Sequence, residues 1–144
     1  MYFNKVNIDK ITIKKRNNLF YDLLFENNKL IFDAPELYVP FGIDECYNNF
    51  ILKLQFRKNK NDVVDFYNFI TNLECKIKSL VGINIKTQII NNNKYDDLIT
   101  TKIIQNKKKD KILTEIYDNN NNIINFYTFK NNVKGNYIKV KLVV

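Results

Sequence analysis

The sequence predicts a mainly β fold with one long helix, arranged as a curved antiparallel sheet or barrel in a single domain of residues 1–144. Runs in which apolar and polar residues alternate occur in both halves of the chain, which is the pattern of half-buried strands. Residues 62–80 instead carry apolar residues at helical spacing. A chain of 144 residues that is 45% hydrophobic is long enough to bury one core.

The first strands are predicted in the N-terminal third of the chain. Apolar residues alternate with polar ones over 6–13, and their parity switches at residues 9–10. A β-bulge there would turn the inward face of the strand over and curve the sheet. Alternation resumes over 19–25, and a turn at 27–28 followed by a strand at 29–32 completes a hairpin.

Residues 33–43 contain both prolines and are predicted to form an extended edge or a loop crossing one end of the sheet, since proline cannot donate to a ladder. Residues 50–56 then alternate more regularly than any other segment. The inward set is predicted to be Phe50, Leu52, Leu54 and Phe56, and the outward set is Ile51, Lys53, Gln55 and Arg57.

A single amphipathic helix is predicted over Val63–Leu80, with Asp62 as its N-cap and Gly82 as a left-handed C-cap. Its buried face is predicted to hold Phe66, Ile70, Leu73 and Ile77. The aromatic residues Phe66, Tyr67 and Phe69 are interpreted as core rather than as a binding site.

The remaining chain is predicted to return to strands, with asparagine runs as turns. The predicted strands are 83–90, 98–105, 111–117, 123–129 and 137–144, and the turns are 91–93 and 119–122. Strands on both sides of one buried helix are typical of an OB-like barrel, although other α+β sheets fit the same pattern.

The composition argues against an enzyme. Without histidine there is no Ser-His or Cys-His pair and no His-containing zinc site, and Cys46 and Cys75 cannot form a four-thiolate site. In each of the acidic pairs at 44–45 and 96–97 the two adjacent side chains are expected to point apart, which is poor geometry for binding a metal ion. We therefore expect no catalytic residues, no metal and no cofactor, and we expect the two cysteines to be reduced.

The sequence also predicts an intracellular protein, in the host cytoplasm or nucleus if it is viral. No apolar run approaches the length of a membrane span, and the N-terminus lacks the apolar stretch of a signal peptide. No membrane partner is expected.

Positive charge is concentrated in the second half of the chain. Residues 1–75 carry 10 basic and 10 acidic residues, whereas residues 76–144 carry 13 and 5, so the net charge of +8 arises from the second half. A one-sided excess attracts a polyanion such as nucleic acid.

Two basic clusters are candidate phosphate contacts. The outward face of the 50–56 strand and the loop after it carry Lys53, Arg57, Lys58 and Lys60. The densest cluster is Lys107, Lys108, Lys109 and Lys111, which is predicted to lie at a hairpin tip between Ile104 and Ile112. Such lysines would neutralise phosphates. The alternative for each cluster is an ordinary solvated face or turn.

Aromatic residues beside lysines point to unpaired bases as the ligand, because exposed rings stack on single-stranded nucleic acid. Near the C-terminus Tyr127 and Phe129 adjoin Lys130, although their direction is ambiguous. Tyr137, Lys139 and Lys141 are predicted to share one outward face of the last strand.

The segments Pro35–Ile43, Phe50–Phe56 and Asp65–Ile70, with Leu73-Glu74, resemble a known family. They look like the OB-fold single-stranded DNA-binding proteins of large nucleocytoplasmic DNA viruses, which are similar to the single-stranded DNA-binding protein of short-tailed phages. That family carries an acidic C-terminal tail that recruits replication proteins, whereas this sequence ends in the basic strand 137–144, so the resemblance does not extend there.

These observations together predict a sequence-tolerant binder of single-stranded nucleic acid. The resemblance implies DNA, with RNA still open, and a role in viral DNA replication, with self-association or viral replication proteins as further partners. The alternative is a viral structural or assembly protein, such as a minor capsid or scaffold-type interaction module.

Overall fold

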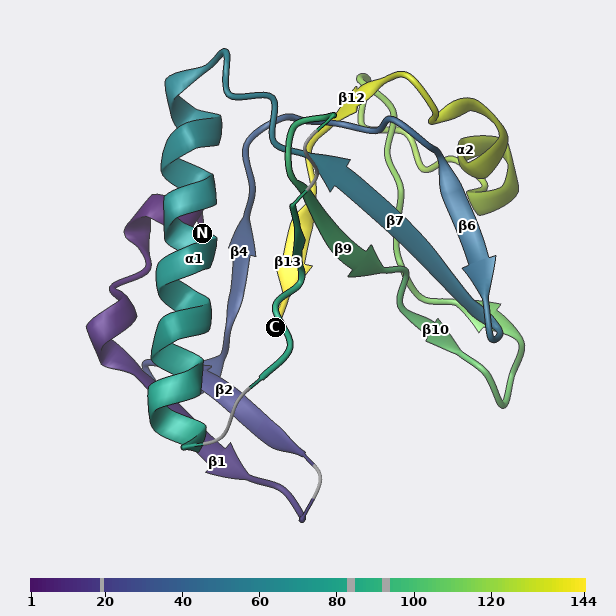
Figure 1. Ribbon diagram of the computed structural model, residues 1–144. Helices are drawn as coiled ribbons and strands as arrows, with labels where there is room; N and C mark the ends of the chain where they lie inside the picture. The colour runs from purple at the N-terminus through teal and green to yellow at the C-terminus, as the bar shows by residue number, and fades with distance from the viewer. Residues whose placement is uncertain (19, 83–84, 92–93) are drawn as a thin grey trace. The chain divides into compact units, whose positions relative to one another are not determined.

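The computed structural model describes residues 1–18, 20–82, 85–91 and 94–144 (Figure 1). The described chain is mainly β, with several antiparallel sheets and one long helix, which confirms the coarse fold class. Within these residues the strands form separate sheets and do not close into a barrel. The elements in chain order are η1 (Phe3–Lys5), η2 (Ile8–Lys10), β1 (Ile11–Lys15), β2 (Tyr21–Phe25), β3 (Asn28–Lys29), β4 (Ile31–Asp33), β5 (Leu37–Tyr38), β6 (Ile43–Cys46), β7 (Asn49–Gln55), α1 (Asn61–Val81), β8 (Ile89–Ile90), β9 (Leu98–Lys102), β10 (Gln105–Asn106), β11 (Lys111–Ile112), α2 (Phe126–Asn132), β12 (Tyr137–Ile138) and β13 (Lys141–Val143).

The chain gathers into two compact units, each built from segments that are distant in sequence. Unit 1 comprises Met1–Leu37, Arg57–Thr87 and Lys139–Val144. Unit 2 comprises Tyr38–Phe56 and Gln88–Ile138.

Unit 1 contains the antiparallel sheet β1-β2-β3, in which Ile11 pairs with Phe25. A hairpin is confirmed as β2–β3, but its turn residues are Glu26 and Asn27, which both have positive φ and lie one residue earlier than predicted. The strand predicted at 29–32 is divided between β3 and β4, which belong to different sheets. The predicted strand over 6–8 with a bulge after it is wrong. Asn7 there accepts a hydrogen bond from the backbone N–H of Asp9, and this local bond favours the 3-10 turn η2 over an extended chain.

Helix α1 supplies much of the core of unit 1. Its buried residues are Val63, Phe66, Phe69, Ile70 and Leu73. The ring of Phe66 lies 5.0 Å from that of Phe3, and the ring of Phe69 lies 5.0 Å from that of Phe32. The predicted face is therefore confirmed, with Ile77 and Tyr67 half-buried at its margin.

The two ends of α1 differ from each other in how well they match the prediction. Gly82 has φ 75° and its N–H donates to the carbonyl of Lys78, so the left-handed C-cap is confirmed. The N-cap prediction is wrong, because the helix begins at Asn61, two residues earlier than predicted, and Lys60, which makes no side-chain capping bond, occupies the cap. Asp62 lies in the first turn, where a carboxylate still complements the helix dipole.

The C-terminal strand completes unit 1. The strand predicted over 137–144 is divided into β12 and β13, and β13 pairs with β4 so that Leu142 lies opposite Phe32. Because the division falls at residues 139–140, β12 belongs to unit 2 and β13 to unit 1.

Unit 2 is organised around β7, the strand predicted at 50–56. The sheet order is β12-β5-β7-β9-β8, and β6 also pairs with β7. Leu52, Leu54 and Phe56 are buried as predicted, and Phe50 is half-buried against Phe126. Gln55 is buried rather than outward, because Tyr38 and Leu98 flank it on the neighbouring strands.

The proline-containing segment enters this sheet, contrary to the prediction of an edge or loop. Its strand β5 lies between β12 and β7. Pro35 and Pro40 flank this two-residue strand without belonging to it, so the ladder loses no donor.

The second half of the chain has less strand than the sequence predicts. The strand 98–105 is confirmed at its start as β9, and the strand 83–90 is reduced to β8, with Ile83 and Asn84 outside the described residues. The strand 111–117 is reduced to β11. Leu19 of the predicted strand 19–25, and Asn92 and Asn93 of the predicted turn 91–93, also lie outside the described residues.

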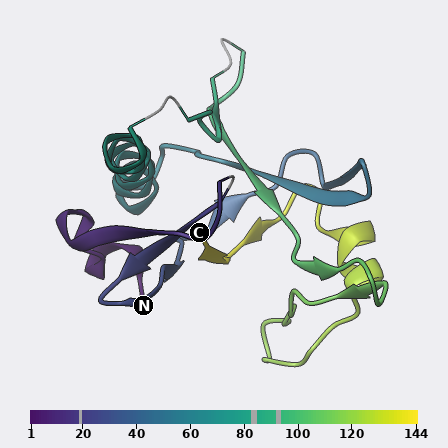
Figure 2. The same cartoon turned by 90° about the horizontal axis from the view of Figure 1, so that it is seen from below.

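The strand predicted at 123–129 is wrong, since residues 126–129 belong to α2 (Phe126–Asn132). The side chain of Asn125 accepts hydrogen bonds from the backbone N–H groups of Tyr127 and Thr128, which is an N-cap. Phe126 and Val133 are both buried, and their separation of seven residues places them on one face of a helix. Figure 2 shows α2 against one face of the unit 2 sheet.

Candidate nucleic-acid interface

The β10–β11 hairpin presents the lysine cluster at its tip, as the sequence predicts. Gln105 pairs with Ile112 and Asn106 with Lys111, and residues 107–110 form the turn. The turn is closed by a bond from the Asp110 N–H to the Lys107 carbonyl, and Asp110 has φ 49°.

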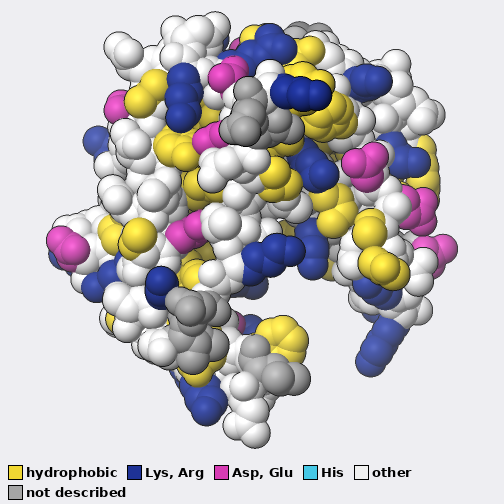
Figure 3. Space-filling model, in the orientation of Figure 1, with side chains coloured by type: hydrophobic (Ala, Val, Ile, Leu, Met, Phe, Trp, Pro, Cys, Tyr) yellow, Lys and Arg dark blue, Asp and Glu magenta, His cyan; other side chains and the backbone are white. Residues whose placement is uncertain are grey.

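The side chains at this tip are exposed cations. Lys107, Lys108, Lys109 and Lys111 are all exposed, and none forms an ion pair with another described residue. Asp110 is the one acidic residue within the hairpin 105–112. Dark blue side chains project at the lower right of Figure 3, over this hairpin. Adjacent like charges repel one another, so an anion bound here would relieve that repulsion.

A second turn of unit 2 presents an aromatic ring that the sequence analysis did not single out. Cys46 pairs with Asn49 across the β6–β7 hairpin, and Tyr47 and Asn48 between them have φ 49° and 62°. Two positive φ values define the tight turn that Asn and Gly normally occupy. Tyr47 is 93% exposed, so its ring buries almost nothing in the fold.

The two turns lie at the same end of unit 2. The side-chain amide of Gln105, at the base of the lysine hairpin, donates to the carbonyl of Asn48 over 2.6 Å. The N–H of Ile103 donates to the carbonyl of Phe50 over 2.9 Å and holds the next residues in register. Figure 1 shows the start of β7 beside β10 at the lower right. We call Tyr47, Lys107, Lys108, Lys109 and Lys111 the tyrosine–lysine surface.

The sheet of unit 2 carries a second, smaller set of aromatic and basic side chains. Tyr137 on β12 is 41% exposed, and its ring centre lies 5.1 Å from that of Tyr38 on β5. On the same sheet Lys53 is half-buried opposite Thr100, and Lys102 is exposed opposite Ile51. Lys102 was not predicted, although the alternation within the strand 98–102 places it on the same face as Thr100.

The predicted stripe of Lys53, Arg57, Lys58 and Lys60 is not one strand face. Strand β7 ends at Gln55, so Lys53 belongs to unit 2, whereas Arg57 and the two lysines after it belong to unit 1. The ammonium group of Lys58 lies 3.9 Å from the centre of the Tyr67 ring, a cation–π contact within unit 1.

The C-terminal candidates are likewise distributed. Tyr127 is 58% exposed on α2, and the Lys130 ammonium lies 5.8 Å from the ring centre of Phe50. Tyr137 does not share a strand with Lys139 and Lys141, because β12 ends at Ile138. The Lys141 ammonium pairs instead with the Asp33 carboxylate over 3.7 Å.

The loop between β11 and α2 contains two groups with shifted pKa values. The hydroxyl of Tyr117 donates to the Glu115 carboxylate, which raises the pKa of this tyrosine. The hydrogen bond from the backbone N–H of Asn122 is the main cause that lowers the pKa of Asp118, and the bond from Asn120 adds to it, against an opposing effect of burial. Both shifts follow from contacts inside the loop and indicate a structural arrangement.

No cluster of three or more His, Cys, Asp or Glu side chains suited to a metal ion occurs in the described part of the chain. No described helix is both long enough and apolar enough to cross a membrane. Comparison of the sequence with protein-family models and with curated proteins, and of the fold with solved structures, finds no match.

Proposed function

We propose that this protein binds single-stranded nucleic acid, DNA in the first instance, without sequence preference and without catalysis, through the tyrosine–lysine surface of unit 2. The observation that carries the proposal is the 2.6 Å hydrogen bond from Gln105 to Asn48, which joins a lysine-rich tip to a turn that presents an exposed ring. Lysines and an aromatic ring at one end of a sheet supply two interactions with a single strand, namely charge neutralisation of its phosphates and stacking on its bases.

Each part of the surface has a distinct role in this proposal. The four lysines neutralise phosphates and release counterions, which gives affinity for any sequence. The Tyr47 ring stacks on an unpaired base, an interaction open to every base because each has a flat face. A duplex hides those faces, so the ring adds affinity for single strands alone.

An OB-like relationship is part of the same proposal. It is supported by the antiparallel sheets and by the single long helix that follows β7, and by the resemblance noted in residues 35–74. That resemblance would place the activity in viral DNA replication, with replication proteins or a second copy of the chain as further partners. Binding through the tyrosine–lysine surface does not depend on this assignment.

The test is a titration of fluorescent oligothymidylate and of a matched duplex with the protein. The variant K107A/K108A/K109A should bind single strands more weakly than wild type. Its plot of log K against log salt should be flatter by up to about 2, because each single-strand phosphate contact contributes about 0.7. The variant K5A/K29A/K78A removes the same charge from exposed lysines outside the surface and should retain most of the wild-type slope. Equal losses in both variants would contradict a localised site.

The assembly-module alternative is favoured by one specific observation. Unit 2 exposes three branched apolar side chains, Ile104, Leu113 and Ile123, whose burial against another protein would be favourable. If wild-type protein does not bind single strands even at low salt, while analytical ultracentrifugation shows it to self-associate, the assembly function replaces the binding function.

A further inference from the structure

The β1–β2 hairpin of unit 1 carries a second grouping of an aromatic ring with cations. Strand β1 ends in Lys14-Lys15, Arg16 follows, and Phe20 precedes β2. The Phe20 side chain is 60% exposed, and Lys14 and Lys15 are exposed without an ion pair to another described residue.

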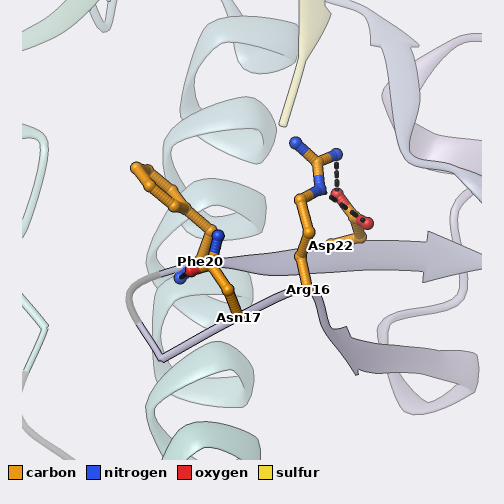
Figure 4. Close-up of polar contacts among 4 residues, drawn as sticks. All are labelled: Arg16, Asn17, Phe20 and Asp22. Carbon is orange, nitrogen blue, oxygen red and sulfur yellow. Dashed lines mark hydrogen bonds and ion pairs between the residues drawn. The ribbon is translucent and has the colours of Figure 1, made fainter.

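The strand register assigns these side chains to faces. Lys14 lies opposite Asp22 and Lys15 opposite Tyr21, so by alternation Lys14 shares a face with Arg16, Phe20 and Asp22. Figure 4 shows the side chains of Arg16, Phe20 and Asp22 on the same side of the hairpin.

Two sets of hydrogen bonds hold this grouping in place. The Arg16 guanidinium donates through Nε, over 3.3 Å, and through Nη2 to the two oxygens of Asp22, which leaves its other N–H groups free to donate outward. The backbone of Phe20 donates to the Asn17 side chain over 3.0 Å and accepts from the Arg16 N–H over 2.9 Å. The ring is therefore presented from a fixed backbone even though its own surface is exposed.

Folding does not account for this ring. The core of unit 1 is formed by buried residues of α1, β4 and the N-terminal turns, together with Ile11, Phe25 and Leu30. Phe20 is not one of these buried residues. Phenylalanine also lacks a polar group that would favour exposure. A ring that shares one face of the hairpin with an exposed lysine, Lys14, and with a braced guanidinium suits a strand with flat bases and a phosphate backbone better than it suits an apolar protein surface.

We infer that the β1–β2 hairpin is a second contact for single-stranded nucleic acid, in which Phe20 stacks on a base while Lys14 and Arg16 contact phosphates. This inference rests on the proposed function and extends it to a surface on the other unit. A strand long enough to reach both surfaces would be held twice, and its apparent affinity would exceed that of a strand held once.

The test uses full-length protein and oligothymidylate in which 5-iodouracil replaces some thymines. Ultraviolet light cross-links this base to an aromatic ring that stacks on it, and peptide mapping then identifies the ring. Cross-links at both Phe20 and Tyr47 are expected. A cross-link at Tyr47 alone overturns this inference and leaves the proposed function standing. A cross-link at Phe20 alone supports the inference and contradicts the proposed surface.

Two variants provide a second readout. Phe20→Leu keeps an apolar side chain without the ring, and it should weaken binding of a strand of about 40 nucleotides by about 5- to 150-fold. Phe20→Tyr keeps the ring and should bind like wild type. Both variants should unfold at the wild-type temperature because the side chain is exposed. Equal affinity of Phe20→Leu and wild type for the long strand overturns the inference.

Discussion

Tyr47 is the residue on which the difference between stacking and charge can be measured most cleanly. Replacement by alanine should weaken single-strand binding by about 1 to 3 kcal/mol, because a base loses its stacking partner. The salt dependence should stay unchanged, since no phosphate contact is lost. Fluorescence titration at several salt concentrations measures both quantities.

Tyr47→Phe is the matched control, and it should bind like wild type because the ring rather than the hydroxyl meets the base. Neither variant should lower the melting temperature appreciably, since the side chain is 93% exposed. If alanine weakens duplex and single-strand binding equally, Tyr47 does not act by stacking.

The hydrogen bonds of the Asp118 carboxylate depend on pH. Its carboxylate accepts backbone N–H bonds from Asn122 and Asn120, and its folded pKa lies below the ordinary 3.8. Because this pKa is lowered by folding, the carboxylate stabilises the loop at pH values above the pKa of Asp118 in the unfolded chain. This stabilisation is lost as the pH falls through the pKa of the folded state. Carbon-13 NMR titration of the Asp118 carboxyl should therefore give a midpoint below 3.8.

Asp118→Asn serves as the control for this titration. It keeps a side-chain oxygen that can accept the same bonds but has no proton to gain in this range, so the amide shifts of Asn120 and Asn122 should become independent of pH. An Asp118 midpoint at or above the ordinary value would contradict the hydrogen-bonded arrangement.

At the level of single residues, the sequence predicts charge better than exposure. The lysine run 107–109 lies at a hairpin tip as expected, because flanking apolar residues and like charges both favour a turn there. Tyr47 escaped notice because alternation describes strands and says nothing about which turn residue is exposed. The feature that could have identified Tyr47 is the two-residue turn between the strand that ends at Cys46 and the strand that begins at Asn49.

Among the elements, α1 has a C-terminus whose stability depends on one backbone conformation. Gly82 has φ 75°, and a Cβ added there would meet no atom within 4 Å, so the cost of a side chain is conformational rather than steric. Gly82→Ala should lower the free energy of unfolding by about 1 to 2 kcal/mol. Chemical denaturation measures the change.

Gly82→Asn should cost less than Gly82→Ala, because asparagine tolerates the left-handed region better than alanine does. A Gly82→Ala variant as stable as wild type would show that the helix does not end as described.

Element prediction succeeded where one period was long and failed where local hydrogen bonds competed with it. The period of α1 extends over 21 residues, and its buried face was predicted correctly at Phe66, Ile70 and Leu73. Segment 123–129 alternates well enough to suggest a strand, yet the side chain of Asn125 caps a helix. Asn7 has the same effect on the first predicted strand. In a chain with 25 asparagines such side-chain bonds are numerous and invisible to hydrophobic periodicity.

For the whole molecule, the sequence reveals the charge asymmetry but not how the chain is divided. The basic excess of residues 76–144 is plain from counting, and the tyrosine–lysine surface draws its lysines from that half. The two units, in contrast, are assembled from interleaved segments, so the stripe expected at residues 53–60 is shared between them. Long-range pairing of this kind, such as β13 with β4, leaves no mark on local alternation.

The central claim is tested most directly by the salt dependence of wild-type binding to single-stranded and duplex DNA of equal length. Log K for the single strand should fall linearly with log salt, with a slope of about −3 if the four lysines of the tyrosine–lysine surface each contact a phosphate. Affinity for the single strand should exceed that for the duplex at every salt concentration, because only unpaired bases can stack on Tyr47. Tighter binding to the duplex, or no binding to single strands at low salt, would contradict the account.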